Sequence, residues 1–271
     1  MKRRLLYMLS VAAVSLVVVA ACTANFDKVA PSPGQGGGGD SGQGGSMARF
    51  TIVGDYIYTV DDNTLKTTRI VDPAHPQPLP FKDMALGDDV ETIFPYNDML
   101  FIGSRSGMYI YDVSRPGFPS LLSFTSHIRS CDPVVAQGNY AYVTLNSDNG
   151  QCGRGRNELI VFDIFDVRNP KQVWTDTSLR YPKGLGIDAS LERLFVCCHG
   201  GLRVYDISVP YEPVWVDDLT NIPEIGSIDT YDVIPDRGIL ILIGDDGLYQ
   251  LDYTGENVEF VSKIDLRGQG E

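Results

Sequence analysis

The chain has 271 residues, of which 43% are hydrophobic and 21% are charged, so it is long enough for a substantial core and too apolar for a disordered chain. Its formal net charge of -13 argues against nucleic-acid binding, which depends on Lys and Arg neutralising phosphates, and against a polybasic membrane contact. An acidic surface accommodates cations or basic partners, and its simplest consequence is solubility.

The first residues predict an export signal. Lys2-Arg3-Arg4 is followed by an apolar run from Leu5 to Ala21, which is the order of charged and apolar regions in a signal peptide. Val19-Ala20-Ala21-Cys22 resembles a bacterial lipobox, in which the cysteine receives the lipid and becomes the first residue of the mature protein. We therefore expect residues 1–21 to be a lipoprotein signal peptide and Cys22 to be lipidated. A plain signal peptide and an uncleaved anchor are the alternatives.

The residues after Cys22 predict an outer-membrane location and a tether. Gram-negative lipoproteins of the inner membrane usually carry aspartate where this chain has Thr23, so the resemblance favours an outer-membrane lipoprotein and leaves open whether it faces the periplasm or the surface. Residues 22–46 are rich in Gly, Ser and Pro, which is typical of a flexible tether. The folded domain is then expected over residues 47–271, and the lipid anchor makes a transmembrane helix unnecessary.

The folded part consists of a recurring unit. Each copy has a short apolar strand that ends in aspartate, and the copies are TRIVDPAHPQP (Thr68–Pro78), MYIYDVSRPGFP (Met108–Pro119), LIVFDIFDVRNP (Leu159–Pro170), LRVYDISVPYEP (Leu202–Pro213) and LYQLDYTGENVEF (Leu248–Phe260). The separations between successive strand-ending aspartates are 40, 51, 43 and 46 residues. A period in the forties, with strands rich in Val, Ile, Tyr and Phe, is typical of propeller blades of four strands.

The repeated aspartates have a structural explanation. An aspartate at the end of the third strand can accept hydrogen bonds from backbone amides in an Asx-turn. The first proline of the unit stops the strand because it has no N–H, and the second precedes the outermost strand, where an edge tolerates a missing donor. We therefore interpret these aspartates as turn formers and not as catalytic acids.

The strings LIVFDIFDVRNP, LRVYDISVPYEP and MYIYDVSRPGFP resemble the LVIVD repeats of bacterial surface and secreted proteins. The resemblance extends over residues 49–266 and is strongest in units two to four; it implies a β-propeller in the cell envelope and supplies no catalytic residues. Five units over 225 residues predict an all-β domain of five blades, each with four antiparallel strands. Two routes of ring closure are open: an N-terminal strand that completes the last blade, or direct packing of blade one on blade five.

The candidate ligand-binding residues are expected on one face, around the mouth of the channel. The loops that enter the first strand of each blade and the hairpins that join its second and third strands share this face, and the insertion NSDNGQCGRGRN (Asn146–Asn157) joins them. Its arginines suit a carboxylate or phosphate ligand, or pair with neighbouring acids. The candidates are Asp89, Arg105, Asp132, Arg154, Arg156, Lys183, His199 and Asp229.

Four cysteines besides Cys22 raise the questions of disulfides and metals. Exported proteins can form disulfides, and Cys131 and Cys152 are candidates for a bridge on one face of the third blade. For Cys197 and Cys198, a vicinal disulfide, buried thiols and a bridge to the insertion remain open. The run Cys197-Cys198-His199 has poor spacing for zinc, so no metal site is predicted. Ca²⁺ is a better candidate than zinc because acids collect at the channel mouth, but these Asp pairs are also good hairpin turns on their own account, and no cofactor is predicted.

The sequence contains no complete catalytic motif, since it has no GxSxG elbow and only three histidines. It predicts a non-enzymatic, lipid-anchored envelope propeller that binds a protein, a peptide or a glycan at the channel-mouth face. A surface hydrolase with paired carboxylates, drawn from Asp89, Glu91, Asp132 and Asp229, is the first alternative. A scaffold that uses its sides and has no central site is the second.

Overall fold

The computed structural model describes residues 45–61, 63–79, 84–87, 90–126, 133–146, 156–222, 224–255 and 257–266. The chain divides into two compact units, Met1–Gly36 and Gly37–Glu271, and every described residue belongs to the second. Among these residues there is no helix, and so none long and apolar enough to cross a membrane. The predicted signal peptide, Cys22 and the tether up to residue 44 lie outside the described residues.

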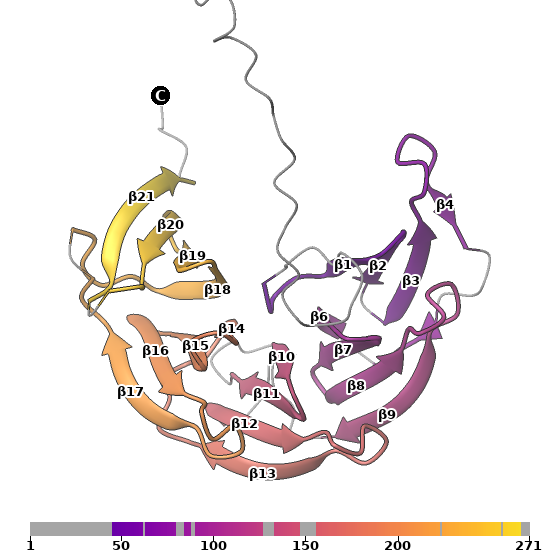
Figure 1. Cartoon of the computed structure of the whole chain (residues 1–271), viewed down its shortest axis with the longest axis horizontal. Helices are drawn as coiled ribbons and strands as arrows, with labels where there is room; N and C mark the ends of the chain where they lie inside the picture. The colour runs from indigo at the N-terminus through magenta and orange to yellow at the C-terminus, as the bar shows by residue number, and fades with distance from the viewer. Residues whose placement is uncertain are drawn as a thin grey trace, which may run out of the picture. The chain divides into compact units, whose positions relative to one another are not determined.

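The described residues form an all-β propeller of five blades, which confirms the predicted fold class (Figure 1). Each blade is a sheet of consecutive antiparallel strands, from the inner strand at the channel to the outer strand at the rim. The first two blades contain β1 (Phe50–Val53), β2 (Tyr56–Asp61), β3 (Thr64–Arg69), β4 (Gln77–Pro78) and β5 (Met84–Ala85), then β6 (Val90–Tyr96), β7 (Met99–Ser104), β8 (Gly107–Asp112) and β9 (Ser120–Ser126).

The other three blades repeat the same order of strands. Blade 3 contains β10 (Val134–Gln137), β11 (Tyr140–Leu145), β12 (Glu158–Asp163) and β13 (Lys171–Asp176). Blade 4 contains β14 (Leu185–Asp188), β15 (Arg193–Cys198), β16 (Gly201–Asp206) and β17 (Val214–Leu219). Blade 5 contains β18 (Thr230–Asp236), β19 (Ile239–Gly244), β20 (Gly247–Asp252) and β21 (Glu259–Asp265).

Blade 1 departs from the pattern at its rim. Its outer position is shared by the two short strands β4 and β5, which both pair with β3. The sequence here contains Pro73, Pro76 and Pro78, and a proline cannot donate to a strand ladder. The prolines therefore explain why β4 is as short as two residues in the described part of this blade.

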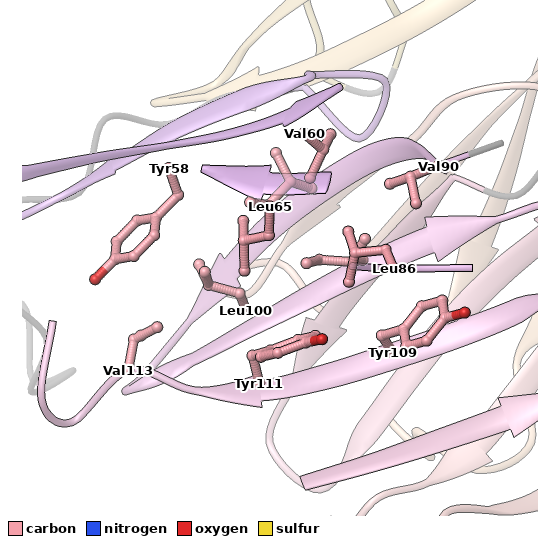
Figure 2. Packing of buried hydrophobic residues seen from close by; sticks show 11 residues of the cluster. Tyr58, Val60, Leu65, Leu86, Val90, Leu100, Tyr109, Tyr111 and Val113 are labelled. Carbon is pink, nitrogen blue, oxygen red and sulfur yellow. The ribbon is translucent and has the colours of Figure 1, made fainter. Parts of the chain in front are cut away.

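The core lies between the blades. Side chains alternate along each strand, so one set packs on the preceding blade and the other on the next. In β11, Ala141 and Val143 belong to the cluster with blade 2, whereas Tyr142 belongs to the cluster with blade 4. Figure 2 shows the cluster between blades 1 and 2, where Leu65 of β3 packs near Leu100 of β7. Four such clusters fill the four interfaces from blade 1 to blade 5.

The repeated Asp-Pro turns have the predicted structure. In all five units a carboxylate oxygen of the strand-ending aspartate accepts the backbone N–H two residues later, at 2.8–3.0 Å; the aspartates are Asp72, Asp112, Asp163, Asp206 and Asp252. These turns also connect blades, because the hydroxyls of Tyr58 and Tyr142 donate to the carbonyls of Pro116 and Pro210 in the next blade, at 2.6 Å and 3.0 Å. The repeat motif is thus a blade joint.

Neither predicted route of ring closure occurs among the described residues. The first strand, β1, belongs to blade 1, and blade 5 takes all its strands from the end of the chain. Blades 1 and 5 share no apolar cluster, and their facing sides leave Phe50 58% and Ile243 38% exposed. In Figure 1 these two blades form the two ends of the series. The first expectation is wrong, because β1 pairs within blade 1. The described residues link blades 2, 4 and 5 through the channel instead.

That link is the channel clasp, which we define as the segment Gly45–Arg49 together with Asp232 of β18. Ser46 is 1% exposed; its Oγ donates to Asp232 Oδ1 at 2.9 Å and accepts the N–H of Leu185, in blade 4, at 2.7 Å. The N–H of Met47 donates to the other oxygen of Asp232 at 3.2 Å. The carbonyl of Ala48 accepts the N–H of Ile93, in blade 2, at 2.8 Å. One short segment therefore connects blades 2, 4 and 5 across the channel.

Candidate functional site

Most of the described candidate residues lie at one end of the strands, which we call the loop face. It comprises the loops that enter the first strand of each blade and the hairpins between the second and third strands. Arg105 lies in the β7–β8 hairpin and His199 in the β15–β16 hairpin, while Lys183 and Asp229 precede β14 and β18. Because the strands of a blade are antiparallel, these positions share one end of the propeller.

His199 is held in place by an acid of the next blade. Its Nδ1 lies 2.8 Å from Asp229 Oδ1, and the N–H of Gly200 donates to the same oxygen at 2.7 Å. The ring of Tyr181 meets the imidazole edge-on, with 6.1 Å between the ring centroids. His199 remains 49% exposed, so the acid orients an imidazole that solvent and ligands can reach.

The segment Arg180–Lys183 lies beside this histidine. The carbonyl of Arg180 accepts the N–H of His199 at 2.9 Å, and the N–H of Lys183 donates to the carbonyl of Cys197 at 2.8 Å. The Lys183 ammonium lies 3.9 Å from the centre of the Tyr231 ring, a cation–π contact with blade 5. We call the group of Arg180, Tyr181, Lys183, His199, Asp229 and Tyr231 the blade 4–5 patch.

Next to the patch, a half-buried charge network joins blade 4 to the end of blade 3. Arg203 Nε and Nη2 donate to the two carboxylate oxygens of Asp218 at 2.7 Å and 3.0 Å, and Arg203 Nη1 donates to Ser178 Oγ at 2.7 Å. The Tyr205 hydroxyl donates to Asp176 Oδ2 at 2.6 Å. The hydrogen bonds to Asp218 raise the pKa of Arg203, so this cation is satisfied by the neighbouring residues and has a structural role.

The other arginine candidates contact acids. Arg105 Nε lies 3.7 Å from Glu91 Oε1, and Arg156 Nη1 lies 3.4 Å from Glu158 Oε1. Glu158 begins β12 and its side chain is buried, so Arg156 neutralises a charge that would otherwise be costly there. Asp89, Asp132, Arg154, Cys131 and Cys152, and with them the predicted bridge, lie outside the described residues.

Of the three alternatives for Cys197 and Cys198, the structure has buried free thiols. Cys197 faces blade 5 and Cys198 faces blade 3, as the alternation of a strand requires. Burial raises the pKa of the Cys198 thiol to about 12, which keeps it protonated and unreactive near neutral pH. Within the described ranges, no group of three or more His, Cys, Asp or Glu side chains could hold a metal ion.

Among the described residues, the patch does not contain the complete set of groups that a catalytic triad needs. A histidine held by an aspartate supplies two parts of a catalytic triad, and the third part is an activated hydroxyl or thiol. The nearby Ser227 hydroxyl donates to the carbonyl of Gly200 at 3.0 Å, and Cys198 is buried and protonated. The described groups of the patch can orient and bind a ligand.

Sequence reasoning missed the two features of the central channel. Asp232 was not a candidate, although a charged residue within an apolar inner strand was the available signal. Burial raises the pKa of Asp232 to about 6, against the hydrogen bonds from Met47 and Ser46 that lower it. The second feature is a cavity of about 270 Å³, lined by residues of the four inner strands β6, β10, β14 and β18. No single repeat could reveal it, because several blades contribute to its wall.

No protein-family model and no curated protein matches the chain. Solved structures do resemble it, among them a protein from Lactobacillus plantarum with a TM-score of 0.60 and 12% identity, which covers 78% of this chain and 68% of its own. Apo AztD from Citrobacter koseri has a TM-score of 0.55 and 16% identity. The match covers 79% of this chain and 60% of AztD.

A periplasmic gluconolactonase from Pseudomonas aeruginosa has a TM-score of 0.56 and 12% identity. The match covers 78% of this chain and 68% of the gluconolactonase. The chain thus spans between 60% and 68% of the length of these three structures. At such low identity the likeness shows the β-propeller fold alone.

Proposed function

We propose that this chain is a non-enzymatic binding module of the bacterial cell envelope, which takes a partner that presents carboxylate groups at the blade 4–5 patch. The observation that supports it most is the placement of Arg180 and Lys183, whose side chains form no ion pair with any described residue. The chain has a net charge of -13, and most other described cations contact an acid. Two cations and an oriented histidine in one place suit an anionic group.

The geometry of the patch favours recognition because its parts are fixed before a ligand arrives. Tyr181 has a φ of 48°, a left-handed conformation that non-glycine residues rarely adopt. Backbone hydrogen bonds on both sides, at Arg180 and Lys183, hold this segment against β15. A preformed site loses less conformational entropy on binding than a mobile loop does. An acidic peptide of an envelope protein is therefore our preferred partner.

The test is a pull-down from intact envelopes with the full-length, lipidated protein, combined with titration of a labelled acidic peptide such as hexaglutamate. Arg180→Gln and Lys183→Gln should each weaken peptide binding several-fold and reduce recovery of the envelope partner, and added salt should have the same effect. The matched control is Lys171→Gln on the rim strand β13, which should change neither result. Equal losses in all three variants would refute the patch as the site.

The anchor and the repeat family belong to the same proposal. We propose that Cys22 carries the lipid that holds the domain at the outer membrane, and that the propeller is of the LVIVD type. The lipobox-like run before Cys22 and the five Asp turns support these assignments. Cys22→Ser should abolish labelling by a palmitate analogue and release the protein from membranes. Retention of the label by this variant would exclude lipidation at Cys22.

The hydrolase alternative has weaker support. One structural neighbour is a gluconolactonase, and the patch contains a histidine oriented by an aspartate. However, Asp229 already accepts hydrogen bonds from its own neighbours, and paired-carboxylate hydrolysis needs a second acid about 5–10 Å away. Turnover of a lactone or glycoside that disappears in Asp229→Asn would favour this alternative over the binding module. The remaining alternative, a scaffold that uses its sides, predicts contacts at the rim.

A further inference from the structure

A pocket of about 180 Å³ adjoins the blade 4–5 patch. It lies over the loop-face ends of β15, β16 and β17, next to the charge network that joins blade 4 to the end of blade 3. The polar side chains that line it are those of Arg180, His199, Arg203, Asp218 and Thr220. Its volume is close to the roughly 150 Å³ of a cavity that accommodates benzene, so the pocket has room for about one side chain of a partner.

Solvent reaches all of these polar residues, but to different degrees. Arg180 and Thr220 are exposed, and the His199 side chain is 49% exposed, so these three form the rim. The Asp218 and Arg203 side chains are 32% and 16% exposed, and they lie deeper. A ligand group that enters the pocket therefore passes the rim before it meets Arg203.

The pocket has more hydrogen-bond donors than free acceptors. Both carboxylate oxygens of Asp218 already accept from Arg203, at 2.7 Å and 3.0 Å. An arginine side chain has five N–H groups, and those of Arg203 that donate to Asp218 and Ser178 leave others unused. The Arg180 side chain forms no hydrogen bond with a described residue. A group that only accepts hydrogen bonds matches this surplus, and a carboxylate is such a group.

Arg180 also supplies an unbalanced charge. Arg203 lies between two acids, since Asp218 accepts its hydrogen bonds and Asp176 Oδ2 lies 3.7 Å from its Nη1. Arg180 has no such acid among the described residues. A carboxylate in the pocket would gain an ion pair with Arg180 and N–H donors from Arg203, and charge-assisted hydrogen bonds are stronger than neutral ones. Lys183, the other cation of the patch, lies over Tyr231 and does not line the pocket.

The depth of Arg203 favours a glutamate over an aspartate. The pocket holds about one side chain, so the backbone of a bound peptide stays outside the rim. The carboxylate of glutamate lies one methylene farther from the backbone than that of aspartate, and it can pass Arg180 and Thr220 to reach Arg203. The carboxylate of aspartate stays at the rim, where water competes for its hydrogen bonds.

We infer that this pocket is the part of the blade 4–5 patch that recognises a glutamate side chain of the acidic partner. The inference rests on the proposed function, and it adds that the partner is recognised by the length of one side chain as well as by its charge. Arg180 and Arg203 bind the carboxylate, while His199 and Thr220 enclose the stem.

The first test compares labelled hexaglutamate with labelled hexaaspartate, which carry the same charge and differ by one methylene per residue. We expect hexaglutamate to bind the full-length protein about tenfold more tightly in fluorescence polarisation, as one additional hydrogen bond to a charged group predicts. Lys183→Gln should lower both affinities by the same factor. Equal affinities for the two peptides, lowered together by Lys183→Gln, would overturn the inference and leave the patch as the site. Binding of neither peptide would refute the proposed function as well.

Two further variants locate the preference. Thr220→Trp fills the mouth of the pocket without changing a charge, so it should lower the affinity for hexaglutamate about tenfold and leave that for hexaaspartate unchanged. The matched control is Asn221→Trp at the next residue, which is exposed, does not line the pocket and should change neither affinity. A hexaglutamate affinity that Thr220→Trp leaves unchanged, or that both variants lower equally, would overturn the inference.

Discussion

At the scale of single residues, aspartates serve two opposite purposes in this molecule. Those that end the third strands accept backbone N–H groups in exposed turns, and the hydrogen bonds from Ser208 lower the pKa of Asp206 to about 2. Asp232 instead lies within the channel, where burial raises its pKa to about 6. The exposed turn thus favours the charged form of the aspartate, and the buried channel favours the protonated form.

We therefore expect Asp232 to make stability depend on pH between about 4 and 7. The folded state keeps its proton up to about pH 6, whereas the unfolded state loses it near 3.8, so the contribution to the free energy of unfolding is present below pH 3.8 and lost as pH rises through 6. The two values differ by about two pH units, which corresponds to about 3 kcal/mol. Urea unfolding at pH 4 and pH 7 should show that loss in the wild type and not in Asp232→Asn.

Asp206 provides the comparison for that experiment. Its pKa is lowered, so it contributes stability above the unfolded value and loses it as pH falls toward 2. Asp206→Asn should therefore show nearly the same change in the free energy of unfolding between pH 4 and pH 7 as the wild type. A wild type whose stability rises steadily from pH 4 to pH 7, in step with Asp232→Asn, would contradict the burial of this carboxyl.

At the scale of strands and turns, the joints between blades alternate in chemistry. The third residue of the second strand is Tyr58, Phe101, Tyr142, Phe195 and Ile241 in the successive blades. The two tyrosines reach a proline carbonyl of the next blade. The phenylalanines lack the hydroxyl, and Ile241 belongs to the side of blade 5 that has no apolar cluster with another blade among the described residues.

We expect Tyr58→Phe and Tyr142→Phe each to lower the free energy of unfolding by about 1 kcal/mol, because each removes a partly buried hydrogen bond and leaves a carbonyl without its donor. Urea unfolding measures the change. Tyr211→Phe is the control. Because Tyr211 is exposed, this substitution should lower the free energy of unfolding by less than about 0.5 kcal/mol. Losses of equal size in all three would show that the hydroxyls of Tyr58 and Tyr142 do not join the blades.

The two faces of β19 predict unequal effects of truncation. Leu242 is fully buried between blades 4 and 5, whereas the next residue, Ile243, is 38% exposed on the opposite face. Leu242→Ala should cost about 2–5 kcal/mol, and Ile243→Ala less than about 1 kcal/mol. A comparable cost for both, measured by urea unfolding, would mean that blade 5 packs against blade 1 in solution.

At the scale of the whole molecule, the sequence predicted what repeats and missed what joins the repeats. The number of blades and the strands around Asp112, Asp163 and Asp206 followed from local patterns, because turn chemistry and strand periodicity are properties of neighbouring residues. The channel clasp joins Ser46 to Asp232, which are 186 positions apart, and nothing local marks Ser46 as different from the glycine-rich residues before it.

The same limit applies to the candidate sites. Lys183, His199 and Asp229 could be assigned to one face from the order of strands, but their contacts with Tyr181 and Tyr231 depend on how blades 4 and 5 approach each other. That approach is close: a side chain at Gly186 would meet the Val233 carbonyl at 2.6 Å. The cavity likewise combines several inner strands, so only the packed structure shows it.

The measurement that tests the central claim most directly is site-specific photo-crosslinking of the full-length protein in intact cells. A photoreactive amino acid would replace Tyr181 in the blade 4–5 patch or, for comparison, Val173 on the exposed rim strand β13. Binding at the loop face predicts a discrete crosslinked partner from position 181, which Lys183→Gln diminishes, and none from position 173. Crosslinks that form only from position 173 would contradict the account and identify the molecule as a scaffold that binds through its sides.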